Sequence, residues 1–226
     1  FNVRKGEIVG IAGLMGAGRT EFAHSIFGNP KSYKISGDMY VEGDKVNFTK
    51  PKQAINKGLA YVSEDRKGNG LILIQDVKEN ITLANLREIA NLSVVNKNRE
   101  IKVAEEYRES LRIKTPSIEQ KVKNLSGGNQ QKVALSKWLF AEPNILILDE
   151  PTNHLDLEMI EWLEAYLEKT KSTLLMVTHD RYFLDRVCNE IIEMEDNQIY
   201  RYQGNYSYFL EKRDERIAMQ QASISK

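Results

Sequence analysis

The chain has 226 residues, 41% apolar and 28% charged, so it can bury a sizeable core, and a disordered or fibrous protein is excluded. Its 32 basic side chains balance 32 acidic ones, so no overall field collects nucleic acid or an anionic membrane. The single cysteine, Cys188, excludes an internal disulfide and fits a reducing compartment. No apolar run approaches the roughly 20 residues that cross a bilayer. The first residues include neither methionine nor a signal-peptide core, which indicates a start inside a larger domain.

The first part of the chain alternates between apolar runs and turn residues. An apolar run at 7–12 leads into a glycine cluster at 13–20 and a segment that stops at 28–30, which predicts a strand, a loop and a helix. Gly-Asp turn pairs divide 35–48 into short alternating stretches, which predict a small antiparallel β lobe. Residues 59–62 then predict a buried strand.

The rest of the chain predicts helices and further buried strands. The expected elements are a charged loop at 63–70, a helical lobe at 77–123, a helix at 129–141, a strand at 145–148, a helix at 157–168, strands at 173–177, 191–194 and 198–202, and a charged helix at 206–222. Because strands alternate with helices and end in polar clusters, we expect a mostly parallel α/β sheet that binds ligands beyond its carboxyl edge.

The predicted elements form one domain over 1–226. Its core, with the small antiparallel β lobe, covers 1–64 and 124–205, and the inserted helical lobe covers 65–123. The charged C-terminal helix covers 206–226, and we expect it to make few buried contacts.

The glycine cluster matches the phosphate-loop pattern G-x-x-x-x-G-K-[ST], except that Arg19 replaces the lysine. Glycines let backbone N–H groups approach a phosphate, and the following helix adds its positive N-terminus. The predicted nucleotide-binding residues are Gly13, Leu14, Met15, Gly16, Ala17, Gly18, Arg19 and Thr20. Thr20 is expected to ligate magnesium, whereas the broad fork of Arg19 predicts slow hydrolysis with binding retained. The alternative is a plain glycine turn between strand and helix.

An acidic pair follows the strand predicted at 145–148. Asp149 lies at the strand edge, where it can hold magnesium through water, and Glu150 can orient or deprotonate an attacking water. The alternative is a helix cap or a surface turn.

The segment 125–131, Leu-Ser-Gly-Gly-Asn-Gln-Gln, is the most specific motif in the chain. A serine and two glycine amides at a helix N-terminus predict a second anion site, separate from the phosphate loop. The set of loops resembles that of ATP-binding cassette (ABC) proteins, which have a P-loop NTPase fold. The resemblance implies ATP and Mg²⁺ as cofactors, and two cassettes that hold each ATP between the phosphate loop of one and the signature of the other. The signature residues are Ser126, Gly127, Gly128 and Asn129.

The resemblance assigns roles to three more segments. It implies that the loop of Asn153, His154, Leu155 and Asp156 crosses the dimer interface. His179 then resembles the switch histidine that contacts the γ-phosphate, with Glu150 as its catalytic partner. Glu64 replaces the glutamine that senses magnesium, and its carboxylate can join Thr20 and Asp149 as a metal ligand. The alternative for Glu64 is a solvated loop residue, and His24 and His154 are interpreted as structural or interfacial.

The resemblance changes subfamily along the chain. Residues 1–152 resemble the second cassette of bacterial monosaccharide importers of the ribose and galactoside type, in motifs at 13–21, 61–67, 79–83 and 125–132. Residues 153–226 resemble the ABC-F group of ribosome-associated tandem-cassette proteins, in motifs at 153–156, 162–164, 178–184 and 204–212. The final helix is similar to the start of their linker. The importer cassette normally departs from the form at 153–156 and lacks the histidine at the switch position, whereas this chain has both. We therefore interpret the chain as a chimera, engineered or recombined, with its join at 149–152, a stretch common to both groups; an unusual natural cassette is the alternative.

Three hypotheses follow. The chain is an ABC-type ATP hydrolase of weak activity that pairs with a second cassette, or a coupling or ribosome-contacting fragment, or a fold chimera without a task. The resemblance implies a sugar permease as partner for 1–152 and a ribosome for 153–226. The expected location is the cytoplasm, peripheral at the inner membrane face.

Overall fold

A six-stranded sheet forms the centre of the computed structural model, which describes residues 2–13 and 16–224. The strand order is β10-β9-β1-β8-β7-β4. The strands are β1 (Ile8–Gly13), β4 (Leu59–Val62), β7 (Ile145–Asp149), β8 (Thr173–Val177), β9 (Glu190–Glu195) and β10 (Gln198–Tyr202). All neighbouring pairs are parallel except β9 and β10, which are antiparallel. The predicted, mostly parallel α/β core is therefore confirmed.

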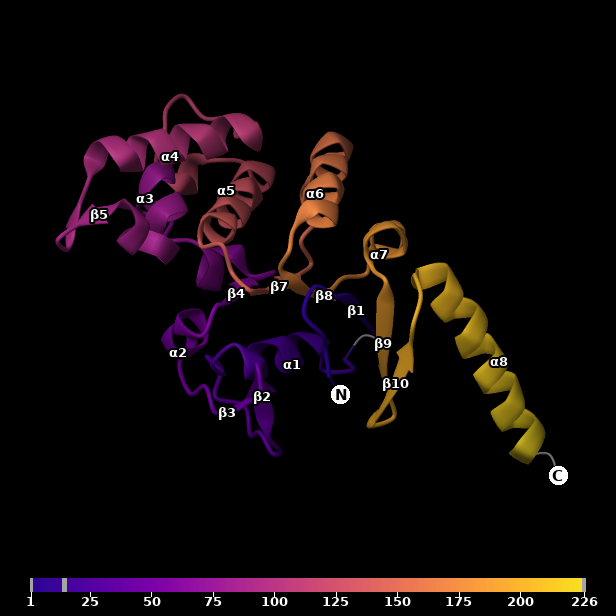
Figure 1. Ribbon diagram of the computed structural model, residues 1–226. Helices are drawn as coiled ribbons and strands as arrows, with labels where there is room; N and C mark the ends of the chain where they lie inside the picture. The colour runs from indigo at the N-terminus through magenta and orange to yellow at the C-terminus, as the bar shows by residue number, and fades with distance from the viewer. Residues whose placement is uncertain (1, 14–15, 225–226) are drawn as a thin grey trace.

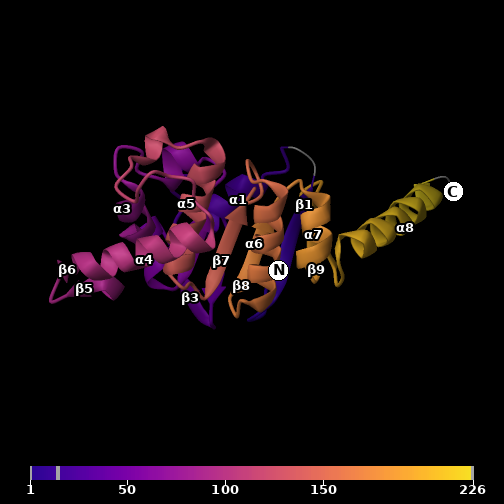
Figure 2. The same cartoon turned by 90° about the horizontal axis from the view of Figure 1, so that it is seen from above.

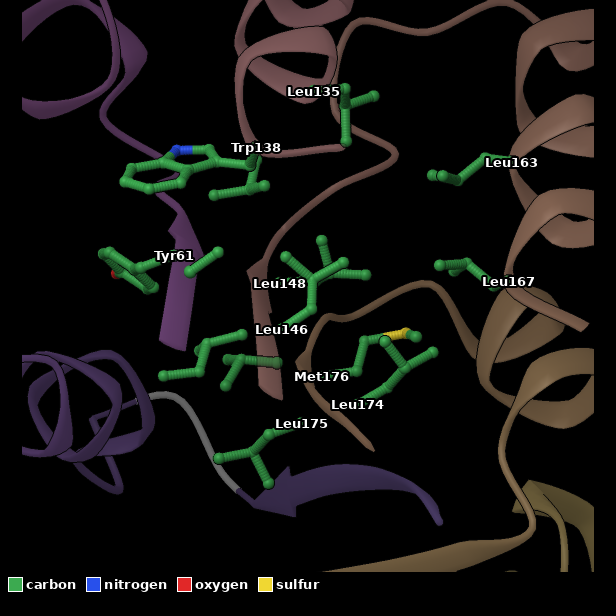
Figure 3. Close-up of a cluster of buried hydrophobic side chains, with 14 of the residues drawn as sticks. Tyr61, Leu135, Trp138, Leu146, Leu148, Leu163, Leu167, Leu174, Leu175 and Met176 are labelled. Carbon is green, nitrogen blue, oxygen red and sulfur yellow. The ribbon is translucent and has the colours of Figure 1, made fainter. Parts of the chain in front are cut away.

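Helices cover both faces of the sheet (Figure 1). On one face lies α1 (Arg19–Ile26); on the other lie α5 (Gly127–Phe140), α6 (Leu157–Lys169) and α7 (Arg181–Val187). Figure 3 shows Leu163 and Leu167 of α6 and Leu135 of α5 pointing towards Leu148 of β7. These side chains are fully buried, and each contributes roughly 1.5–3 kcal/mol through burial. The core thus fixes the strands whose carboxyl ends carry the polar motifs.

The β lobe has the predicted hairpin and one helix that the sequence analysis missed. Its elements are β2 (Met39–Val41), β3 (Asp44–Val46) and α2 (Pro51–Asn56). Proline at the first helical position and the Gln53 side chain, which accepts a hydrogen bond from the Lys50 amide at 3.1 Å, start this helix.

The helical lobe is confirmed, with two additions. Its elements are a π-helical turn η1 (Arg66–Gly70), α3 (Val77–Thr82), a 3₁₀ helix η2 (Leu83–Ile89), β5 (Ala90–Asn91), β6 (Val94–Val95), α4 (Lys97–Ser110) and η3 (Val122–Asn124). The turn η1 replaces the expected loop because Asp65 accepts a hydrogen bond from the Gly68 amide at 2.9 Å. The β5–β6 hairpin turns at Leu92 and Ser93, which both have positive φ.

The C-terminal helix α8 (Tyr206–Ile224) is docked against the body at its beginning. Phe209 is 2% exposed, and Arg216 lies 3.6 Å from the centre of the Tyr200 ring. The first half therefore has more buried contacts than expected, whereas the second half projects from the body (Figure 2). Within the described chain, every helix is too short or too polar to cross a membrane.

Candidate active site at the carboxyl edge of the sheet

The polar motifs meet where the parallel strands end. Val62 is in register with Leu148, and Asp149 with Val177, so the residues after β4, β7 and β8 reach one edge. The phosphate loop after β1 reaches the same edge, because β1 lies beside β8. The expected site at the carboxyl edge is thereby formed from four strands.

The phosphate loop connects β1 to α1. Gly16 and Gly18 have φ of +84° and +81°, and no atom lies within 4 Å of the position that a Cβ would take. Gly13 packs against β9, since a Cβ there would lie 2.8 Å from the Met194 carbonyl oxygen. Open glycines before a helix N-terminus leave the room that phosphate oxygens need. Ala17 lies between the two open glycines, and the predicted residues Leu14 and Met15 lie outside the described residues.

Arg19, the residue that departs from the phosphate-loop pattern, contacts His179, the residue predicted to be the switch histidine. One of its terminal nitrogens, Nη2, lies 2.8 Å from Nε2 and 3.2 Å from Nδ1 of His179. Arg19 is 8% exposed. A guanidinium N–H can only donate, so the ring nitrogen that receives it carries a lone pair. The two residues, 160 positions apart, therefore form one unit at the sheet edge.

Asp149 is completely buried at the end of β7. The Tyr61 hydroxyl donates to its Oδ2 at 2.7 Å, and the Thr20 hydroxyl donates to its Oδ1 at 3.4 Å. Burial raises the pKa of Asp149 to about 6, while the hydrogen bond from Tyr61 lowers it. The sequence analysis placed Thr20 and Asp149 together but missed Tyr61, whose only signal was a hydroxyl on a buried strand.

Glu150 points towards the end of β8. It has φ of +48°, and its Oε2 accepts hydrogen bonds from the Thr178 hydroxyl at 2.9 Å and from the His179 amide at 3.2 Å. Its Oε1 lies 3.5 Å from His179 Nε2. Left-handed backbone is uncommon in a non-glycine residue and is maintained by its surroundings. Thr178 was not predicted; its position directly before His179 was the signal.

Glu64 lies beside the two expected metal ligands. It lines a pocket of about 350 Å³ together with Thr20, Asp149 and His24. His24 is 6% exposed and stacks against Tyr33, which agrees with a structural role. Among the residues that the structure describes, no group of three or more His, Cys, Asp or Glu side chains is arranged to hold a metal ion alone. Hydroxyl and carboxylate oxygens are nevertheless the donors that Mg²⁺ prefers alongside phosphates.

The signature segment begins α5. Ser126 caps the helix, with its Oγ 3.4 Å from the Asn129 amide. The Asn129 side chain also accepts a hydrogen bond from the Lys114 amide at 2.8 Å, which ties the segment to the helical lobe. In the described part of the chain, no hydrogen bond or ion pair joins Ser126, Gly127, Gly128 or Asn129 to the phosphate loop. The structure therefore does not bring these two predicted anion sites together.

The predicted interface loop packs against the signature instead. A Cβ on Gly128 would lie 2.6 Å from the His154 carbonyl oxygen, and one on Gly127 would lie 2.9 Å from Nη2 of Arg66. Asp156 caps α6 by accepting from the Met159 amide at 2.9 Å. Leu155 is half-buried, and Asn153 is exposed with His154 and Asp156. Arg66, which the sequence analysis did not single out, thus adds a cation beside the signature.

The parallel sheet, phosphate loop, β lobe and inserted helical lobe define a P-loop cassette fold. An ABC transporter family model matches residues 1–153, and a second ABC transporter model matches 192–226. The chain belongs to the ABC transporter family. The solved dimeric structure of a bacterial ABC transporter cassette superposes with a TM-score of 0.73 at 25% identity, covering 90% of this chain and 88% of that one.

The similar curated proteins named here are sugar transport proteins. The L-arabinose transport ATP-binding protein AraG of Geobacillus stearothermophilus is 50% identical, over 88% of this chain and 39% of its own length. The xylose import ATP-binding protein XylG of Thermoanaerobacter pseudethanolicus is 55% identical, over 69% of this chain and 31% of its own length. The ribose import ATP-binding protein RbsA of Clostridium tetani is 45% identical, over 88% of this chain and 40% of its own length. The chain thus spans less than half of each relative.

Proposed function

We propose that the chain binds Mg-ATP and hydrolyses it slowly at a site that a second cassette completes. The observation that carries this is the network at the carboxyl edge, where Arg19, Thr20, Asp149, Glu150 and His179 meet although three separate elements supply them. A structural cap or turn does not need such convergence of buried charges. The raised pKa of the buried Asp149 fits this, because carboxyl groups with perturbed pKa values in a cleft are typical of functional sites.

Each residue has a task in this proposal. The amides of the phosphate loop hold the phosphates, and Thr20, Asp149 and Glu64 hold the magnesium ion, which neutralises phosphate charge when bound. Glu150, fixed by Thr178 and the His179 amide, accepts the proton of the attacking water. Arg19 and His179 lie beside one another and would contact the γ-phosphate.

The second cassette supplies the signature in this proposal. The signature and interface loop lie together, and no hydrogen bond or ion pair joins them to the described residues of the phosphate loop of the same chain, which supports their use by a partner. A dimer with two-fold symmetry presents the signature of each copy to the phosphate loop of the other. The solved relative is itself described as dimeric.

We further propose a role in sugar import, with a membrane permease as partner and a cytoplasmic position peripheral to the inner membrane face. The names of the arabinose, xylose and ribose relatives support this assignment. The fraction of those relatives that the chain spans leaves room in a complete protein for a further cassette.

The ABC-F resemblance of residues 153–226, the ribosome contact, the linker-like role of 206–226 and the recombined origin rest on sequence motifs alone. The relatives named above are all sugar transport proteins, which favours the import role. The separate family-model match at 192–226, which contains α8, supports treating this end as a distinct segment.

Binding and turnover of Mg-ATP by the purified chain test the proposal. We expect saturable binding, slow release of phosphate, and weaker magnesium-dependent binding in Thr20→Ala. Thr49→Ala, an exposed threonine in the β lobe, is the matched control and should behave as the unchanged chain. A chain that binds no ATP would favour the fragment or fold-chimera hypothesis.

A further inference from the structure

A second pocket, of about 250 Å³, lies between the phosphate loop and the C-terminal helix α8. Gly13, Arg19 and His179 line it. Arg181, at the start of α7, and Arg213 of α8 also line it. Three guanidinium groups from distant parts of the chain therefore surround one cavity that shares residues with the phosphate loop.

The two carboxylates that also line this pocket are already occupied. Nη2 of Arg216 donates to Glu193 at 2.9 Å and to Glu195 at 2.7 Å, and the Tyr202 hydroxyl donates to Glu193 at 3.2 Å. Burial raises the pKa of Glu193, against the opposing effect of Arg216. These carboxylates thus bind α8 to β9 through Arg216. The charge of Arg213 also acts on Glu193 and lowers its pKa, but among the described residues no ion pair or hydrogen bond joins Arg213, Arg181 or Arg19 to either carboxylate.

The pocket arginines lack strong partners within the chain. Among the residues that the structure describes, Arg213 forms an ion pair only with its neighbour Asp214, at 3.3 Å, and the Asp214 side chain is 71% exposed. In that same part of the chain the Arg213 Nε is buried without a hydrogen-bond partner. Within the described residues Arg181 forms no ion pair, and Arg19 donates to a histidine ring rather than a carboxylate. A buried donor without an acceptor is costly, and an oxyanion supplies acceptors in the planar geometry that guanidinium matches.

We propose that Arg213, with Arg181, binds a phosphate oxyanion in this pocket and extends the nucleotide site onto α8. The proposal rests on the proposed nucleotide function, because the pocket shares Gly13 and Arg19 with the phosphate loop. The oxyanion is a phosphate group of the bound nucleotide, and free inorganic phosphate is the other source of the same chemistry. Arg213 and Arg216 lie one turn apart, so nucleotide and β9 hold the same turn of α8. The position of the helix then reports whether nucleotide is bound.

The test compares Arg213→Ala with Lys212→Ala, a neighbouring exposed cation that pairs with Glu215. Mg-ATP binding to the full chain should weaken about tenfold in Arg213→Ala, the loss of one charge-assisted hydrogen bond, and remain unchanged in Lys212→Ala. Arg213→Lys keeps the charge and should retain most of the affinity. Equal thermal unfolding of all variants shows that the fold is intact.

Titration with inorganic phosphate, in the presence of saturating Mg-ADP, distinguishes the two sources. If the nucleotide supplies the oxyanion, Arg213→Ala weakens Mg-ATP binding while this titration is the same as in the unchanged chain. If free phosphate is the ligand, Arg213→Ala weakens the binding of inorganic phosphate and leaves the affinity for Mg-ATP unchanged. The oxyanion site would then stand, with free phosphate rather than the nucleotide as its ligand. If Arg213→Ala binds both probes as tightly as the chain without the substitution, the proposal is overturned and the proposed function stands. If the chain without any substitution binds no Mg-ATP, that result counts against the proposed function.

Discussion

The phosphate-loop edge and the signature segment use their polar residues in different ways. At the edge, Asp149 is fully buried and Glu150 is 7% exposed, and each is hydrogen-bonded to other members of the site. In the signature, Ser126 is exposed and caps a helix. The difference teaches that the charged groups of one region are buried and paired within the chain, whereas the other region leaves its serine at the surface, where the proposed second cassette can reach it. The following predictions test this contrast.

The largest expected effect is the loss of hydrolysis in Glu150→Gln. The amide removes the proton acceptor and leaves the metal ligands in place, so turnover should fall at least about 100-fold. ATP-dependent dimers should persist or become more stable, as measured by sedimentation with and without Mg-ATP. Glu161→Gln, an exposed substitution on α6, is the control. Monomers under both conditions would remove the composite site.

Arg19→Lys should raise turnover about two- to fivefold. The compact ammonium fits between phosphate oxygens, and it no longer presents the fork that now bonds to the His179 ring. Phosphate release assays measure the change, with the exposed Arg87→Lys as control. A turnover that falls or stays the same would show that Arg19 is adapted to this site.

The two halves of α8 should differ in their protection from hydrogen exchange. Hydrogen exchange should find the second half of α8, after Arg216, the least protected helix segment, because residues 218–223 are exposed. Protection factors there should be at least about 100-fold below those of β7. The first half of α8 is anchored by Phe209 and Arg216, so its protection factors should lie between those of the second half and those of β7. Protection of 217–223 equal to that of β7 would mean that the entire helix belongs to the core.

The prediction with the smallest effect on the site concerns Lys137, on the signature helix α5, and the pH dependence of the free energy of unfolding. Burial lowers its pKa from 10.5 to about 8. The unfolded chain therefore holds more protons between these pH values, and stability should rise across that window by up to about 3 kcal/mol. Lys137→Met should lack this rise in urea unfolding at pH 7.5 and 10, whereas the exposed Lys169→Met should keep it. Parallel pH curves for the two variants would contradict the assignment.

The sequence predicted what local patterns determine. The glycine spacing of the phosphate loop, the apolar strand before Asp149 and the signature before α5 placed the principal groups correctly at their elements. The pairings across the chain were not predictable in this way, because the Tyr61 hydroxyl on Asp149 joins residues 88 positions apart. The β5–β6 hairpin was missed since Leu92 and Ser93 are unusual residues for left-handed turn positions.

Complementation between two inactive variants tests the contrast between the two regions most directly. Glu150→Gln disables the phosphate-loop side of a site, and Ser126→Arg places a bulky cation on the signature side. Each alone should be inactive. When equal amounts are mixed before Mg-ATP is added, half of the dimers should be mixed and carry one intact site, so about one quarter of the unchanged activity should return. A mixture no more active than either variant would contradict a site shared between two copies.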